Sequence, residues 1–85
     1  MNMLEHSEVL KETFDGIFFG EVVDRRDDKE YDRVKVRVFG VFDDPIEVAH
    51  IPWAYPARVN GELPSLGDIV TVFFREGDLY QPIYL

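Results

Sequence analysis

The chain has no cysteine among its 85 residues, so neither a disulfide framework nor a thiolate metal site supports its fold. Its two histidines, His6 and His50, lie far apart and lack the spacing of a zinc site. Neither a phosphate-binding glycine loop nor a Gly-x-Ser-x-Gly nucleophile motif occurs. We therefore expect no catalytic, cofactor-binding or metal-binding residues, and we predict that the protein is not an enzyme.

Positive charge is also scarce. Nine Lys and Arg residues stand against 17 Asp and Glu residues, which gives a formal net charge of −8. This balance disfavours nucleic acid as a partner, because phosphate binding depends on clustered cations. The acidic clusters at Asp27–Asp28, Asp43–Asp44 and Glu76–Asp78 lack the spacing of a calcium loop, which favours solvated turns over an ion site or a catalytic carboxylate pair.

Long apolar runs are missing as well. No run approaches 18 residues, so we expect no membrane span. The first 14 residues lack the basic and apolar regions of a secretory signal. The chain is nevertheless 46% hydrophobic, with seven Phe, four Tyr and one Trp, which is a composition that builds one compact core. We assign residues 1–15 to a short helical or flexible N-terminal extension and residues 16–85 to one globular domain.

From Gly16 onward the patterns favour β-strands. Val34, Val36 and Val38 alternate with charged residues, which is typical of a strand with one buried face. Gly20 lies inside the first strand and predicts a bulge or a bend there. Strands are expected over residues 16–24, 33–42, 51–59, 69–75 and 79–85, with the third at an edge or irregular because it contains two prolines.

Five short strands in so small a chain predict an all-β fold, a five-stranded OB-type Greek-key barrel, with an SH3-like barrel as the alternative. The chain closes on an apolar strand that must be paired to be stable. We therefore expect Tyr84 and Leu85 to be at least partly buried, in the barrel or against a partner. If this last strand is exposed at an edge, it can extend the sheet of another protein.

The chain has more aromatic residues than the core of one small barrel can bury. In the fourth strand Val70, Val72 and Phe74 point one way, and Ile69, Thr71 and Phe73 point the other way. Either the N-terminal segment or a protein partner that covers the second set would explain the surplus. The candidate interface residues are Phe18, Phe19, Trp53, Tyr55, Phe73 and Tyr84.

Arg33, Lys35 and Arg37 form the single basic row of the chain. With neighbouring aromatic residues, this row can serve as a platform for an oligonucleotide, which needs cations for the backbone and rings for the bases. The alternative is a solvated strand face whose cations pair with acids such as Glu21 and Asp24. The net charge favours the alternative.

Four segments, in order, resemble the OB domain of the phage baseplate central-spike family. "GEVVDRRD" before "DRVKVRVFGVF" is similar to its two opening strands, "IPWAYP" to its Leu-Pro-Trp segment, and "LPSLGDIVTVFFREGDLYQPIYL" to its closing hairpin. The related spike of the type VI secretion system shares this closing pattern. The resemblance runs from about Gly16 to Leu85. Asp32 stands where the family commonly has glycine, and the loop of residues 58–67 is shorter than in T-even-like members.

The resemblance implies a structural collar that packs against other baseplate or tail proteins, as a possible homotrimer, in the phage virion after synthesis in the host cytoplasm. It implies no cofactor. We assign neither peptidoglycan cleavage nor membrane piercing to these residues, since those activities belong to other domains of the family. The main alternative is a stand-alone oligonucleotide-binding OB-fold protein.

Overall fold

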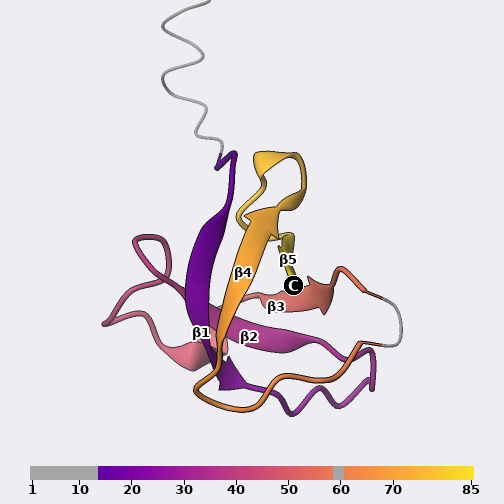
Figure 1. Ribbon diagram of the computed structural model, residues 1–85. Helices are drawn as coiled ribbons and strands as arrows, with labels where there is room; N and C mark the ends of the chain where they lie inside the picture. Colours follow the sequence, from indigo (N-terminus) through magenta and orange to yellow (C-terminus); the bar gives the residue numbers. More distant parts are fainter. Residues whose placement is uncertain (1–13, 59–60) are drawn as a thin grey trace, which may run out of the picture.

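A computed structural model describes residues 14–58 and 61–85 of the chain. These residues form one closed barrel of mostly antiparallel strands. In Figure 1 the first and fourth strands, β1 and β4, lie side by side and cross β2 and β3 steeply. The strands are β1 Phe18–Asp24, β2 Val34–Val38, β3 Trp53–Pro56, β4 Ile69–Phe74 and β5 Pro82–Tyr84. The predicted helical or flexible segment falls on residues 1–13, outside the described residues.

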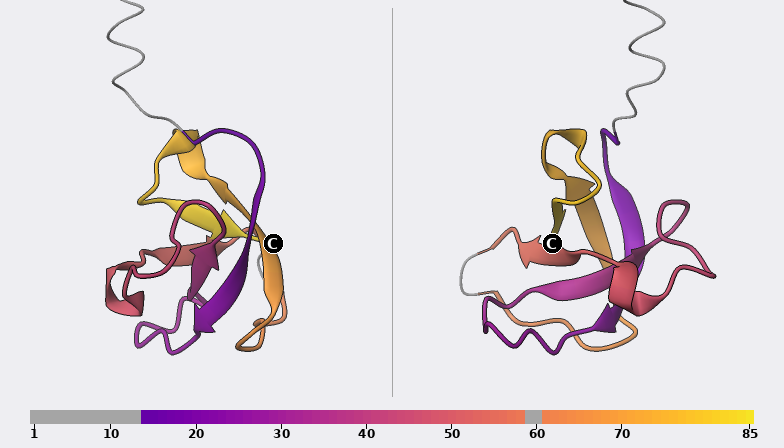
Figure 2. Two further views of the ribbon diagram at one scale, coloured as in Figure 1. Left: turned by 90° about the vertical axis from the view of Figure 1, so that its left-hand side faces the viewer. Right: turned by 180° about the vertical axis from the view of Figure 1, so that it is seen from behind.

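The strand order β1-β2-β3-β5-β4 closes on itself because β4 also pairs with β1. All pairings are antiparallel except that of β3 with β5, which is parallel. Figure 2 shows β5 lying between β4 and β3. The prediction of an all-β, five-stranded OB-type barrel is confirmed, and the described residues add only two 3-10 turns, Val48–His50 and Arg75–Gly77.

The register settles two questions about strand edges. The third strand was expected at an edge or irregular; the edge is excluded, since β3 pairs with β2 through Trp53 and Ala54 and with β5 through Tyr55 and Pro56. The last strand pairs with both β3 and β4, so the condition for extending a partner's sheet, an exposed edge, is not met. Closure of the barrel is the reason, since it gives each strand a neighbour on both sides.

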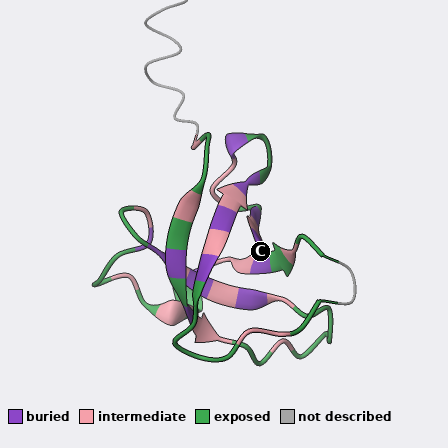
Figure 3. Cartoon of the chain, viewed as in Figure 1, coloured by how far each residue is buried: buried purple, intermediate pink, exposed green. Residues whose placement is uncertain are grey.

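The core is built by the period-two alternation of the strands (Figure 3). Along β2 all three valines are buried and the residues between them are half-buried. Along β4 the same alternation buries Val70, Val72 and Phe74, as the sequence predicts. The buried hydrophobic residues are Val22, Val34, Val36, Val38, Phe42, Ile51, Ala54, Val70, Val72, Phe74 and Tyr84.

Aromatic rings close one end of the core. Phe18 and Phe42 meet Phe74 in edge-on contacts, with ring centroids 5.3 and 6.2 Å away. Phe14 packs on Phe74 as well, at 6.1 Å, and its backbone N–H donates to the carbonyl of Gly77. Phe14, which we assigned to the N-terminal extension, therefore packs on the barrel.

Gly20 lies where β1 passes closest to β2. A Cβ atom at this position would be 2.6 Å from the Arg37 carbonyl oxygen and 2.6 Å from a methyl group of Val36. The predicted irregularity in β1 exists, but the register shifts between Val22 and Asp24 rather than at Gly20. The glycine therefore permits close approach of two strands and does not form the bulge.

The final strand is tied into the barrel as expected. Tyr84 is buried, and its hydroxyl donates to the carbonyl oxygen of Asp32 at 2.7 Å. Burial is the main cause of the raised pKa of Tyr84, followed by the charge of Asp32. The N–H of Leu85 donates to the Thr71 carbonyl, although the Leu85 side chain is 57% exposed.

The loop between β1 and β2 is organised around one carboxylate, Asp27. Its oxygens accept from the backbone N–H groups of Lys29, Tyr31 and Arg33, and from Nε and Nη2 of Arg33 at 2.9 and 2.8 Å. Both side chains are buried, with 3% of Asp27 and 11% of Arg33 exposed. Asp32, where the resembling family commonly has glycine, adopts a φ of 60° in this loop, a conformation that glycine also favours.

This environment holds the pKa of Asp27 far below its ordinary value. The hydrogen bonds from the Arg33 side chain are the largest cause, burial opposes them, and the three backbone N–H groups add to them. In turn, the hydrogen bonds to Asp27 raise the pKa of Arg33. The pair fixes the loop to the start of β2.

Replacing Gly20 with alanine is expected to destabilise the barrel by about 2 kcal/mol or more, because the new methyl group overlaps the backbone of β2. Chemical denaturation measures the free energy of unfolding. The neighbouring exposed Glu21→Ala is the control, with an expected change within about 0.5 kcal/mol. Equal stability of the two variants would contradict the close approach at Gly20.

Asp27→Asn is expected to lower the free energy of unfolding at neutral pH by about 3 kcal/mol, since it leaves the buried Arg33 cation unpaired. The folded-state pKa of Asp27 lies below its unfolded value of about 3.9. Its contribution to stability is therefore present above the unfolded pKa and is lost as the pH falls through the acid range.

Denaturation curves from pH 7 to pH 2 test both points. The wild type should lose stability on acidification more steeply than Asp27→Asn. The control is Asp28→Asn, which changes the exposed neighbouring carboxylate and should resemble the wild type. If Asp28→Asn is destabilised as much as Asp27→Asn, the buried pair does not organise the loop.

Candidate interaction surface

An apolar row crosses the outside of the barrel over four strands. Tyr55 on β3 lies opposite Ile83 on β5, and Ile83 lies opposite Phe73 on β4. Phe73 shares the outer face of β4 with Thr71, which lies opposite Phe19 on β1. Trp53 continues the row along β3. We call this set the outer row: Phe19, Trp53, Tyr55, Thr71, Phe73 and Ile83.

The outer row contains four of the six candidate interface residues. Phe19 is 55% exposed and Tyr55 is 49% exposed, whereas Trp53 and Phe73 are half-buried. The other two candidates point inward. Phe18 packs against the core beside Phe74, and Tyr84 is itself a core residue. The structure therefore packs these two side chains within the barrel, and the other four candidates lie on its outer face.

Three exposed aromatic residues were not singled out from the sequence. Tyr31, Phe39 and Tyr80 are 57%, 51% and 78% exposed, and all three lie in connections between strands. A signal was present, since aromatic residues in polar turns have no core to enter. Phe39 also lies beside the outer row, because its N–H donates to the carbonyl of Phe19.

Arg33 lies among three aromatic rings at one end of the outer row. Its Cζ atom is 5.5 Å from the ring centre of Tyr31, 5.4 Å from Trp53 and 5.5 Å from Tyr55. Lys35 also approaches Trp53, with Nζ 5.0 Å from the ring centre. These contacts hold Trp53 and Tyr55 in fixed positions, which lowers the entropic cost of using them to bind a partner.

The side-chain donors of the basic row form hydrogen bonds and ion pairs within the chain. Arg33 binds Asp27, as described above. The ammonium of Lys35 donates to the carbonyl oxygens of Val48 and Ala49, at 3.0 and 3.4 Å. A phosphate on this face would have to displace the carboxylate and carbonyl acceptors that these two cations already have.

Arg37 ends the basic row and holds the long loop between β2 and β3. Its Nη1 donates to the carbonyl oxygens of Phe42 and Ile46, at 3.3 and 2.7 Å. It also lies 3.5 Å from a carboxylate oxygen of Asp44. The acids named from the sequence, Glu21 and Asp24, lie opposite Arg37 and Lys35 in the register, but the structure gives neither an ion pair with the basic row.

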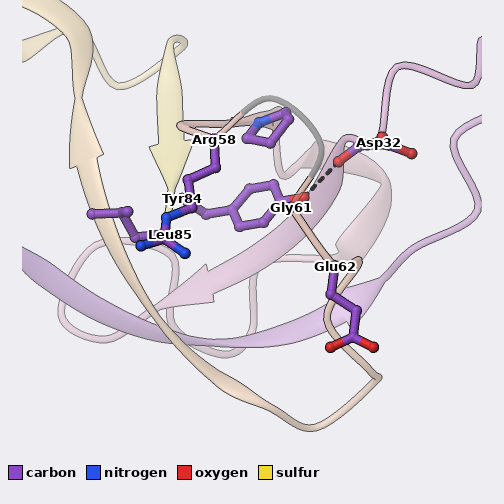
Figure 4. A pocket seen from close by; sticks show the side chains of 7 residues that line it. Asp32, Arg58, Gly61, Glu62, Tyr84 and Leu85 are labelled. Atoms are coloured by element: carbon purple, nitrogen blue, oxygen red, sulfur yellow. Dashed lines mark hydrogen bonds between the residues drawn. The ribbon is translucent and has the colours of Figure 1, made fainter.

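A cavity of about 390 Å³ opens beside the end of β5 (Figure 4). Asp32, Arg58, Glu62 and Leu85 line it, and the Tyr84 ring forms its floor with the hydroxyl turned toward Asp32. Among the described residues that line the cavity, no nucleophile lies beside a base, and the Tyr84 hydroxyl is already engaged by the Asp32 carbonyl.

In the part of the chain that the structure describes, no three side chains of the types His, Cys, Asp or Glu come together as ligands for an ion. Within the same residues, no helix has the length and apolarity needed to cross a membrane.

The comparison with protein families gives one match. The family model described as the type VI secretion system/phage-baseplate injector OB domain matches residues 18–85, which is most of the chain and the whole barrel. No curated protein matches the chain. The matched range begins at the first residue of β1, and the strand order and the closing hairpin fit the resemblance drawn from the sequence. The chain therefore belongs to the family of injector OB domains found in type VI secretion systems and phage baseplates.

Proposed function

We propose that this domain is a structural module of a contractile-tail baseplate or central spike, and that it acts in assembly by packing against other proteins. The outer row carries the proposal. A closed barrel of this size has one interior, and that interior is filled by the valines and by Phe74. Phe19, Tyr55 and their neighbours in the row therefore remain on the surface in the isolated chain.

The composition of the row suits a protein interface. Interface centres are enriched in Trp, Tyr and Phe and depleted in free charge. The row has this composition, and the two cations beside it, Arg33 and Lys35, are engaged within the chain. Its residues also lie on strands rather than on loops, so they present a rigid surface.

The partners we propose are other baseplate or tail proteins, with a homotrimer as the form in which this chain is assembled. The family supports a place in the phage tail or in the related secretion injector. For a phage protein this means synthesis in the host cytoplasm and incorporation into the virion. In this proposal the domain is not an enzyme and uses no cofactor. It contributes to assembly through a rigid barrel and the surface with which that barrel packs against other proteins.

The outer row is tested by Phe19→Ser and Phe73→Ser, introduced into the genome that encodes the chain. Tail or injector particles are then purified by sedimentation, and the amount of bound chain is measured. We expect at least a tenfold loss of incorporation, since truncation of an aromatic residue at an interface centre costs about 2 kcal/mol.

The matched control is Leu66→Ser, which removes a large exposed side chain, 61% exposed, from the loop before β4. It should leave incorporation unchanged. Thermal unfolding of the purified variants should match the wild type because these side chains lie outside the core. Normal incorporation of stably folded Phe19→Ser and Phe73→Ser chains would refute the row as an assembly surface.

The oligonucleotide alternative is tested by titrating the chain with labelled single-stranded DNA at low salt. We expect no binding, because the donors of Arg33, Lys35 and Arg37 are occupied and the net charge is −8. Binding that weakens steeply as salt is added would favour the alternative, since that dependence reports contacts between cations and phosphates.

A further inference from the structure

A groove of about 450 Å³ lies at the end of the outer row, between β3 and the connection from β4 to β5. Its volume falls within the range of about 300–1,000 Å³ that is typical of ligand pockets. Most of its lining is apolar or aromatic, and its polar groups are few. The lining residues are Tyr55, Arg75, Tyr80, Gln81, Pro82 and Ile83.

Two tyrosines form the open walls of the groove. Tyr80 is 78% exposed and Tyr55 is 49% exposed, so both rings present apolar faces to solvent. The backbone around Tyr80 is nevertheless fixed, because Asp78 accepts from its N–H and from the side-chain amide of Gln81, each at 2.9 Å. The groove is therefore a built feature of the turn rather than a gap between free side chains.

Arg75 supplies the charge of the groove. Its side chain is exposed, and the structure gives it no ion pair or hydrogen bond with any residue in the described ranges. The cations of the basic row, by contrast, all have acceptors within the chain. The nearby carboxylate of Asp78 is engaged by its own turn. Arg75 is thus an available guanidinium beside an apolar groove.

We propose that this groove binds an extended segment of another protein, which places apolar side chains between Tyr55 and Tyr80 and a carboxylate against Arg75. Tyrosine and arginine are the residue types that most often dominate binding energy at protein interfaces. Arg75 is the one cation that lines the groove, so it selects a single acidic group, whereas the net charge of −8 opposes a polyanion.

This inference rests on the proposed function, since it takes the partner to be a neighbouring protein in the same assembly. The groove shares Tyr55 and Ile83 with the outer row, so the two surfaces adjoin. Phe19 and Phe73 do not line the groove, and Arg75 and Tyr80 lie outside the outer row. The two claims can therefore fail separately.

Three blocked peptides serve as probes: acetyl-Gly-Leu-Leu-Glu-Gly-amide, and the same peptide with glutamine or lysine in place of glutamate. Each is titrated into the full isotope-labelled chain and followed by amide chemical shifts. We expect shifts confined to the amides of Tyr55, of Arg75 to Gln81, and of Ile83. The glutamate peptide should bind about two- to fivefold more tightly than the glutamine peptide, as is usual for one exposed ion pair, and the lysine peptide most weakly.

Two variants separate the parts of the groove. Arg75→Gln should remove the preference for glutamate over glutamine and leave the affinity for the glutamine peptide unchanged. Tyr80→Ala should weaken all three peptides by about fivefold or more, since it removes one wall. Arg58→Gln, a second exposed cation outside the groove, is the matched control and should preserve the preference.

Shifts at other places on the surface, equal affinity for the lysine and glutamate peptides, or loss of the preference in Arg58→Gln would each overturn the groove as an acidic-segment site. A failure here together with poor particle incorporation of Phe19→Ser and Phe73→Ser would leave the proposed function standing. Peptide binding in the groove together with normal incorporation of those row variants would refute the outer row alone.

Discussion

Strand β2 is the element on which the rest of the structure depends, because its two faces serve different parts of the molecule. Its three inward valines lie at the centre of the core, and all are at most 2% exposed. On its outer side, Lys35 and Arg37 hold the carbonyl groups of the following loop, while Arg33, just before the strand, holds the carboxylate of the preceding one. One alternating stretch therefore sets the core and fixes both adjacent loops.

This use of the cations shapes the surface that remains. Guanidinium and ammonium groups that donate to the protein's own acceptors are poorly placed to neutralise phosphates. The outer row remains on the outside of the barrel, and Arg33 and Lys35 contact two of its rings, Trp53 and Tyr55. Arg33 and Lys35, whose donors are engaged within the chain, also lie against the rings of Trp53 and Tyr55, and aromatic residues held in place are effective anchors in protein assembly.

The sequence was sufficient for the fold and for the inward or outward direction of most strand residues. Alternation placed Phe73 outside and Phe74 inside because side chains in a strand follow a period of two. It was insufficient at Phe18, which sits at the start of β1 and packs with Phe74 over the end of the core. For Tyr84 the sequence predicted burial in the barrel or against a partner, and the ring fills the barrel, with 6% of the residue exposed.

The contacts made by the loops could not be predicted from the sequence, for a different reason. The basic row was expected to pair with acids across the sheet, but closer acceptors lie in the flanking loops, whose paths depend on many weak turn preferences. The positive φ of Asp32 and the carboxylate of Asp27 decide one of those paths. The groove beside Arg75 could not be predicted from local sequence pattern, because its lining comes both from β3 and from the segment that leads into β5. The absence of a partner for the Arg75 side chain among the described residues could not be predicted for the same reason.

The central claim is that the outer row is exposed in the isolated chain and covered in the assembled particle. Hydroxyl-radical footprinting with mass spectrometry, carried out on the free chain and on purified tail or injector particles, measures this directly. The account predicts that Phe19, Phe73 and Tyr55 react in the free chain according to their exposure and become strongly protected in the particle, while Leu66 reacts equally in both. Equal reactivity of the row residues in the two samples would contradict the account.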